Sequence, residues 1–175
     1  TFVAEAVAAG KLCLYRAEGY RSGAGEEHAD TPADPRAFDL LFTEEHTPDA
    51  ARRAARQGEA EASGVKLARD LGNGPANHVT PAVLADEAQR LARVHGFACT
   101  VLDGEGIRAK GMGALWAVAR GATVDPRFLI LEPCPRGREN DRPVVIAGKG
   151  IPLDSGGISL QPAAQRGELT IHLGG

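Results

Sequence analysis

Helical and strand patterns alternate along the second half of the chain, and this alternation constrains the fold more than any other feature. Residues 80–95 begin with Thr-Pro and are followed by glycine. They predict a helix, because threonine can cap, proline fits the first turn and glycine ends a helix. Short apolar runs at 98–102, 128–132 and 144–147 predict strands. Helices alternating with such strands predict an α/β fold whose sheet is covered on both faces.

A longer helix is predicted upstream, from residue 47 to about residue 71. Thr47 can cap it, Pro48 already has the φ of the first helical position, and Asp49 places an acid against the helix dipole. Its apolar side is mostly alanine, which suits a helix that lies across a surface or joins two domains. Asn-Gly-Pro at 73–75 ends the helix, since glycine supplies a left-handed cap and proline cannot continue it.

The remaining segments have weaker signals. The first 20 residues begin with a helical Ala/Glu-rich composition, and residues 11–15 are either a short strand or the end of that helix. Glycine, proline and charged residues at 21–37 are typical of a surface loop. We expect a strand at 37–43 and a short helix around residue 107.

Charge and hydropathy exclude several classes of function. Twenty basic and 23 acidic residues give a net charge of -3, which provides no long-range attraction for nucleic acid or anionic membranes. No apolar run is long enough to span a bilayer, and the first 20 residues lack a secretory signal. These observations predict a soluble, cytoplasmic protein that binds neither membranes nor nucleic acid.

The cysteines and the chain ends give two further expectations. Cys13, Cys99 and Cys134 are widely spaced and form no Cys-x-x-Cys pair, so neither a disulfide framework nor a thiolate zinc site is predicted. We expect buried free thiols at Cys99 and Cys134. The sequence begins with Thr1 and ends on Leu-Gly-Gly directly after a motif-rich stretch, as in a segment of a longer protein.

A glycine-rich stretch, GKGIPLDSGG at 148–157, follows directly on the predicted strand 144–147. Open α/β sheets bind their ligands at the carboxyl ends of strands, so this stretch is the first place to look for a site. The chain has only four lysines, and Lys149 stands here between two glycines. Glycines allow close approach of the backbone to a ligand, or a positive φ.

Three interpretations of this stretch remain open from its residues alone. A glycine-rich loop with a lysine can bind phosphate, but the spacing does not match the P-loop pattern. Lys149 and Asp154 can instead be metal ligands, because a carboxylate is a hard donor and a desolvated amine can coordinate a cation. The third interpretation is a structural turn with an internal ion pair between the two side chains, and the residues alone favour it.

Three segments, taken in order, resemble the leucyl aminopeptidase family, the di-metal cytosol aminopeptidases. They are ARDLGNGPANHVTPAVLADEA at 68–88, KGMGALWAVARGA at 110–122 and GKGIPLDSGGISLQPAAQRGELTIHLGG at 148–175. The resemblance implies a remnant of an amino-terminal α/β domain at 1–46 and a connecting helix at 47–71. The first part of a three-layer α/β/α catalytic domain would then occupy 72–175.

The resemblance also implies roles for four residues. Lys149 and Asp154 match two metal ligands of the family, and His172 falls where the family has a third ligand, an aspartate. Gln161 replaces a lysine that polarises the scissile carbonyl, so it is a catalytic candidate without the family's charge. The family's two further carboxylate ligands lie downstream of Gly175, and we expect the 175-residue chain alone to be inactive or impaired.

By resemblance, the expected function is metal-dependent hydrolysis of the amino-terminal residue from peptides or amino-acid amides. The family uses two divalent ions, zinc or manganese, and is typically a homohexamer. The alternative, suggested by the altered positions Gln161 and His172, is a non-catalytic scaffold or assembly protein built on the aminopeptidase fold.

Several other polar or aromatic residues are interpreted as structural. His78 is expected in a turn or on the surface. Asn73 and Asn77 are predicted to hydrogen-bond the backbone of the turn near them. Met112 and Trp116 are predicted to lie in the core.

Overall fold

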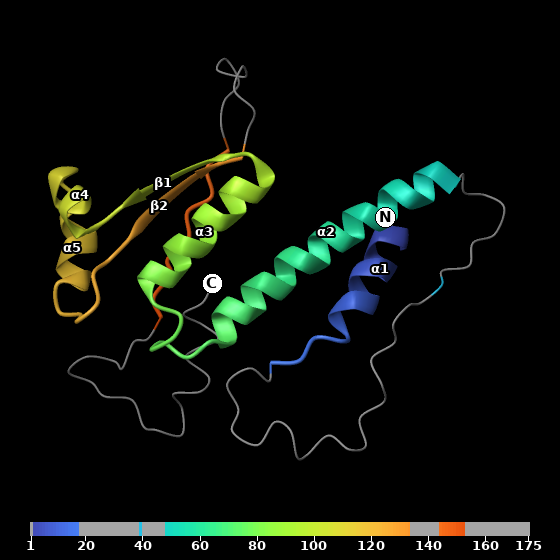
Figure 1. Cartoon of the computed structure of the whole chain (residues 1–175), viewed down its shortest axis with the longest axis horizontal. Helices are drawn as coiled ribbons and strands as arrows, with labels where there is room; N and C mark the ends of the chain where they lie inside the picture. The colour runs from blue at the N-terminus through green and yellow to red at the C-terminus, as the bar shows by residue number, and fades with distance from the viewer. Residues whose placement is uncertain (1, 18–38, 40–47, 134–143, 153–175) are drawn as a thin grey trace, which may run out of the picture. The chain divides into compact units, whose positions relative to one another are not determined.

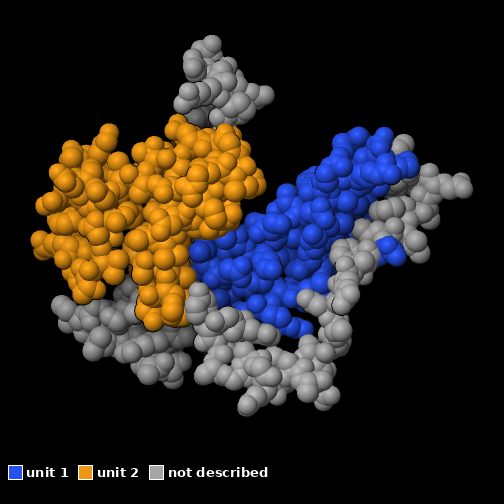
Figure 2. Space-filling view, viewed as in Figure 1, with its two compact units in different colours: residues 1–73 blue, residues 74–175 orange. Residues whose placement is uncertain are grey.

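The computed structural model describes residues 2–17, 39, 48–133 and 144–152 (Figure 1). The chain divides into two compact units, residues 1–73 and 74–175 (Figure 2). The elements, in chain order, are α1 (Phe2–Leu12), α2 (Pro48–Asn73), α3 (Pro81–His95), β1 (Ala98–Leu102), α4 (Gly104–Ala109), α5 (Gly113–Ala119) and β2 (Phe128–Glu132). None of the helices in these described ranges has the length and apolar character needed to cross a membrane.

In the first unit, α1 and α2 pack together through small side chains. Ala4 of α1 is buried, as are Gly58 and Ala62 of α2. A Cβ built on Gly58 would collide with the Ala4 carbonyl oxygen and lie 2.9 Å from its carbon. The two backbones therefore approach each other as closely as they do because residue 58 has no side chain. The prediction of a long alanine-lined helix beginning near residue 48 is confirmed.

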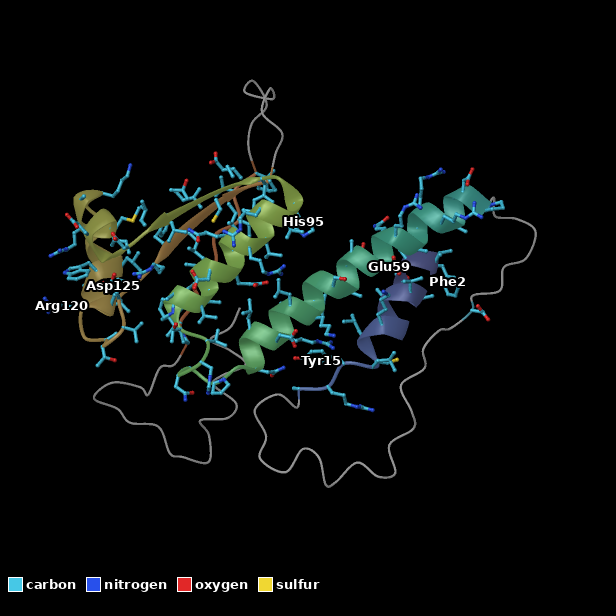
Figure 3. The ribbon with its side chains drawn as sticks, viewed as in Figure 1. Phe2, Tyr15, Glu59, His95, Arg120 and Asp125 are labelled. Carbon is cyan, nitrogen blue, oxygen red and sulfur yellow. The ribbon has the colours of Figure 1, made fainter. Side chains whose placement is uncertain are left out.

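Polar contacts join the last turn of α1 and the residues just after it to α2. The Lys11 ammonium lies 3.2 Å from the Glu59 carboxylate. Asn73 Nδ2 donates a hydrogen bond to the Tyr15 hydroxyl at 3.2 Å, and the Arg69 guanidinium lies 5.4 Å from the centre of the Tyr15 ring (Figure 3). Asn73 was predicted to hydrogen-bond the backbone of the turn near it. The hydrogen bond observed for its side chain is instead to the side chain of Tyr15, 58 positions away. Of the two alternatives for 11–15, the end of a helix is the one observed.

In the second unit, α3 has both of the predicted helix signals. The Thr80 hydroxyl accepts a hydrogen bond from the Val83 amide at 3.4 Å, which caps the amino terminus. Gly96 ends the helix with a φ of 73°, in the left-handed region. The buried face of α3 consists of Ala85, Ala88 and Ala92, and the helix packs against both strands of the sheet.

The described sheet has two strands, β1 and β2, which pair antiparallel from Ala98↔Glu132 to Leu102↔Phe128. The predicted bounds of both strands are confirmed. Side chains alternate between the two faces along each strand. Cys99 is half-buried, so the prediction of a buried thiol is wrong in degree for this residue, and Cys134 lies outside the described residues.

Two short helices connect the strands. Helix α4 is capped by Asp103, whose carboxylate accepts a hydrogen bond from the Gly106 amide at 2.9 Å, and Ile107 within the helix is fully buried. Met112 and Trp116 are half-buried, which corrects their prediction as core residues. The Arg108 guanidinium lies 4.9 Å from the centre of the Trp116 ring, so a flexible surface side chain covers part of the indole.

The predicted strand at 144–147 is not formed. Val144, Val145 and Ile146 are 91%, 81% and 93% exposed, and no strand is assigned to them. A strand requires a hydrogen-bonded neighbour, and in the described residues β1 and β2 pair only with each other. The strand predicted at 37–43 lies outside the described residues except for Asp39, which is exposed and not in a strand.

Candidate functional site

Lys149 lies on the irregular segment 144–152 and is exposed. Its neighbours Gly148 and Gly150 do not have positive φ angles, because among the described glycines only Gly96 and Gly111 do. A Cβ built on Gly148 would have no atom of the described residues within 4 Å. Neither glycine is required by a left-handed backbone, so the φ > 0 explanation does not apply to Gly148 or Gly150, and Gly156 and Gly157 lie outside the described residues.

The same segment approaches helix α3 immediately after Lys149. A Cβ built on Gly150 would lie 3.9 Å from Leu84 Cδ1, an ordinary van der Waals separation. Exposure also falls at this point, since Ile151 and Pro152 are half-buried whereas residues 144–150 are exposed. In Figure 1 the segment, coloured orange-red, runs beside α3. The lysine thus lies just before the point where the segment approaches the helix.

The other three predicted site residues, Asp154, Gln161 and His172, lie outside the described residues. Their roles stay predictions. Within the part of the chain that the structure describes, no group of three or more histidine, cysteine, aspartate or glutamate residues is arranged to hold a metal ion.

The chemistry of the predicted donor set suits a divalent transition metal. Asp154 supplies a carboxylate oxygen and His172 an imidazole nitrogen, both common ligands of zinc. Lys149 would supply an amine nitrogen, and its side chain is exposed in this structure. The residues therefore fit a metal centre in the kind of donor atom that they offer.

A polar cluster that the sequence analysis missed lies around Asp125, in the connection between α5 and β2 (Figure 3). Its carboxylate accepts hydrogen bonds from Arg127 Nη1 at 2.6 Å and from the Gly104 amide at 3.3 Å. These bonds, the one from Arg127 first, lower the pKa of Asp125. A Cβ on Gly104 would lie 2.5 Å from Asp125 Oδ1, so the contact depends on that glycine.

The Asp125 cluster has a structural role. It joins the loop before β2 to the first residue of α4. The short spacing of Asp-Pro-Arg at 125–127 could have indicated the pairing of Asp125 with Arg127. The hydrogen bond from Gly104 has no such signal, because Gly104 is 21 positions away.

Three other charged or polar residues make contacts within α3 or in the turn before it. Glu87 and Arg90 form an ion pair at 2.7 Å on α3, and the hydrogen bond from Arg90 lowers the pKa of Glu87. The His78 amide donates to the Pro75 carbonyl at 2.8 Å in the turn before α3, and the residue is exposed. The interpretation of His78 as a surface turn residue is confirmed.

Comparison with known proteins identifies relatives along the whole chain. Residues 66–175 match the model of the cytosol aminopeptidase family, catalytic domain. A probable cytosol aminopeptidase of Nitratidesulfovibrio vulgaris is 46% identical over 99% of this chain and 34% of its own length. One from Desulfovibrio desulfuricans is 43% identical over 99% of this chain and 34% of its own length.

Solved structures also match almost the whole of this chain. The bottromycin maturation enzyme BotP in complex with Mn matches 99% of this chain and 33% of its own, with a TM-score of 0.76 and 35% identity. An M17 aminopeptidase from Trypanosoma brucei matches 99% of this chain and 32% of its own, with a TM-score of 0.65 and 25% identity.

These matches settle the fold class and the family. The α/β fold predicted from the sequence is that of part of an aminopeptidase of this kind. The chain spans about a third of the length of the relatives that it matches. The family model covers more than half of the chain, and it includes the whole glycine-rich stretch with Lys149 and Asp154. The chain therefore belongs to the cytosol aminopeptidase family.

Proposed function

We propose that this protein is a metal-dependent aminopeptidase, a hydrolase that removes the amino-terminal residue from peptides or amino-acid amides. The observation that carries the proposal is the match of residues 66–175 to the family's catalytic domain, through the stretch that contains Lys149 and Asp154. The 46% identity to a probable cytosol aminopeptidase supports it.

Lys149, Asp154 and His172 would hold two divalent ions, zinc or manganese. Manganese is supported by the similar BotP structure, which is a complex with Mn. When bound, such ions act as Lewis acids and lower the pKa of a bound water. His172 brings no negative charge where the family has an aspartate, so this centre is less anionic than that of the family. We expect the two ions to bind less tightly than in a site with the aspartate.

Gln161 has a different effect from His172. Its amide can donate a hydrogen bond to the substrate carbonyl, but it cannot supply the full positive charge of the family's lysine. Loss of one preorganised donor to a developing oxyanion slows a reaction on the order of 100- to 1000-fold. Peptide hydrolysis by this protein is therefore expected to be slower than in relatives with lysine at this position.

The second candidate function is a non-catalytic scaffold or assembly role. It is favoured by the same two departures, Gln161 and His172, because each would weaken the chemistry that the family performs at its position. Under either function we propose a cytoplasmic homo-oligomer, a hexamer by family resemblance. We also propose the division into an amino-terminal remnant at 1–46, a connecting helix at 47–71 and the catalytic part at 72–175.

Native mass spectrometry of the 175-residue chain after incubation with Mn²⁺ or Zn²⁺ tests the enzymatic proposal. We expect two ions per chain, and their loss in Asp154→Ala, because the variant removes a carboxylate ligand. The control is Asp86→Ala, which removes an exposed carboxylate from α3 in the same unit and is expected to bind metal as the wild type does.

Metal binding by the wild type would be followed by an assay on leucyl amides, in which slow hydrolysis is expected. If the wild-type chain binds no metal, the proposal that Lys149, Asp154 and His172 alone hold the two ions is wrong, and the scaffold role is favoured for the 175-residue chain.

A further inference from the structure

The last turn of α2 lacks the cap that the sequence predicts for it. Among the described glycines only Gly96 and Gly111 have a positive φ, so Gly74 does not supply the expected left-handed cap. The last turn also has no basic side chain to offset the negative end of the helix dipole. The final carbonyl groups of a helix have no partners within it, and helix ends fray. A contact from outside the helix has its largest effect at such an end.

Tyr15 makes such a contact from the segment that follows α1. Its backbone is held in a turn, since the Tyr15 amide donates to the Leu12 carbonyl at 3.1 Å. Its side chain is half-buried, and its hydroxyl accepts a hydrogen bond at 3.2 Å from Nδ2 of Asn73, the final residue of α2. One turn earlier, the Arg69 guanidinium lies 5.4 Å from the centre of the ring, within the range of a cation–π interaction. Tyr15 thus contacts the end of α2 at two points one turn apart (Figure 3).

These two contacts reach into the region that matches the family. The match to the catalytic domain begins at residue 66, so Arg69 and Asn73 lie within it, whereas Tyr15 lies before it. Residues 66–73 nevertheless belong to the first compact unit. Residues 74–80 connect α2 to α3, so unwinding of the last turn of α2 would lengthen this connection.

We infer that Tyr15 acts as a strap, which keeps the last turn of α2 helical through its contacts with Arg69 and Asn73. The strap thereby fixes where the first unit ends and where the connection to the second unit begins. Two contacts one turn apart oppose unwinding of the whole turn, whereas one contact at Asn73 would hold only the final residue. The inference does not depend on metal binding or on hydrolysis.

The ring contact can be measured in the wild-type 175-residue chain. An NMR experiment should show a nuclear Overhauser effect between the Tyr15 ring protons and the Arg69 side-chain protons, because the guanidinium lies over the ring. Absence of this effect in the folded chain would overturn the inference.

Substitution of Tyr15 tests what the contacts do. Tyr15→Phe keeps the ring and removes the hydroxyl, so we expect hydrogen exchange of the Gly72 and Asn73 amides to become about 2- to 10-fold faster, as for one lost hydrogen bond. Tyr15→Leu removes the aromatic ring as well and should speed this exchange further. The matched control is Gln57→Ala, which removes another exposed side-chain hydrogen bond of α2, from Gln57 Nε2 to Glu61 at 2.8 Å. It should leave both amides unchanged.

A second control separates the strap from a general loss of stability. Val7→Ala shortens a buried side chain of α1 and should speed exchange of the amide of Ala62, a buried residue of α2, without changing Gly72 and Asn73. If Val7→Ala and Tyr15→Phe speed exchange of Gly72 and Asn73 equally, these amides report unfolding of the whole unit and the strap is wrong. Unchanged exchange of both amides in Tyr15→Leu would also contradict it.

Discussion

Asp125 shows how a single carboxylate can join two parts of a chain. It accepts hydrogen bonds from Arg127, in its own loop, and from Gly104, at the beginning of α4. Both bonds stabilise the ionised form and lower the pKa of the carboxyl group. Because the pKa is lower in the folded chain than in the unfolded chain, the contribution to stability is present at neutral pH and is lost as the pH falls through the lowered pKa.

Replacement of this carboxylate should therefore change the acid response of the chain. In Asp125→Asn the ion pair with Arg127 is lost, and we expect a lower melting temperature at neutral pH than in the wild type. The difference should shrink as the pH falls below the usual carboxyl range, where the wild-type side chain is itself protonated. Thermal unfolding followed by circular dichroism at several pH values measures this. An equal difference at every pH would contradict it.

Gly58 is a second position where one atom decides the packing. A Cβ there would meet the backbone of Ala4, so Gly58→Ala must push α1 and α2 apart. Overpacking of this kind destabilises by about 1–3 kcal/mol, against a gain in helix propensity of about 0.5–1 kcal/mol. We expect a net decrease in the free energy of unfolding in urea.

Gly64, in the same helix, is a matched control. A Cβ there has nothing within 4 Å, so Gly64→Ala should give the propensity gain without the clash and should stabilise the chain. If both variants change stability by the same amount, the close approach of α1 and α2 is not what limits residue 58.

At the scale of elements, the caps of α3 give a further prediction. Thr80→Ala removes the hydroxyl that accepts from the Val83 amide and should destabilise the chain by about 0.5–1 kcal/mol, near the lower end for caps because the bond is long at 3.4 Å. Thr80→Ser keeps the hydroxyl and should retain most of the stability. Urea unfolding of both variants measures the difference, and equal losses would show that the hydroxyl does not act as a cap.

Helix α3 and strands β1 and β2 were predicted well, whereas the strand predicted at 144–147 was not observed. Helix α3 has its cap, its proline and its terminal glycine within the sequence that forms it, so its bounds follow from the chain itself. Strands β1 and β2 also matched, because each is a short apolar run between clear breaks. The run Val144–Ile146 has a similar composition but is exposed and in no strand, since a strand forms only where a neighbour is available.

At the scale of the whole molecule, the sequence was enough to predict the family and the position of one candidate site residue. The glycine-rich stretch led to Lys149, which the structure describes, and to Asp154, and the family resemblance added Gln161 and His172. The last three lie outside the described residues. The approach of Gly150 to Leu84 could not have been predicted, because 66 positions separate the two and neither belongs to a pattern that links them. The same is true of Asn73 and Tyr15, 58 positions apart.

The pairing of α1 with α2 also has a consequence for tolerance to insertion. The two helices are joined by residues 13–47, and the entropy of closing a chain segment between two ends grows only with the logarithm of its length. Doubling such a connection weakens the pairing by about 0.6 kcal/mol. One added methyl group at Gly58 therefore disturbs this helix pair more than an insertion of many residues between the helices would.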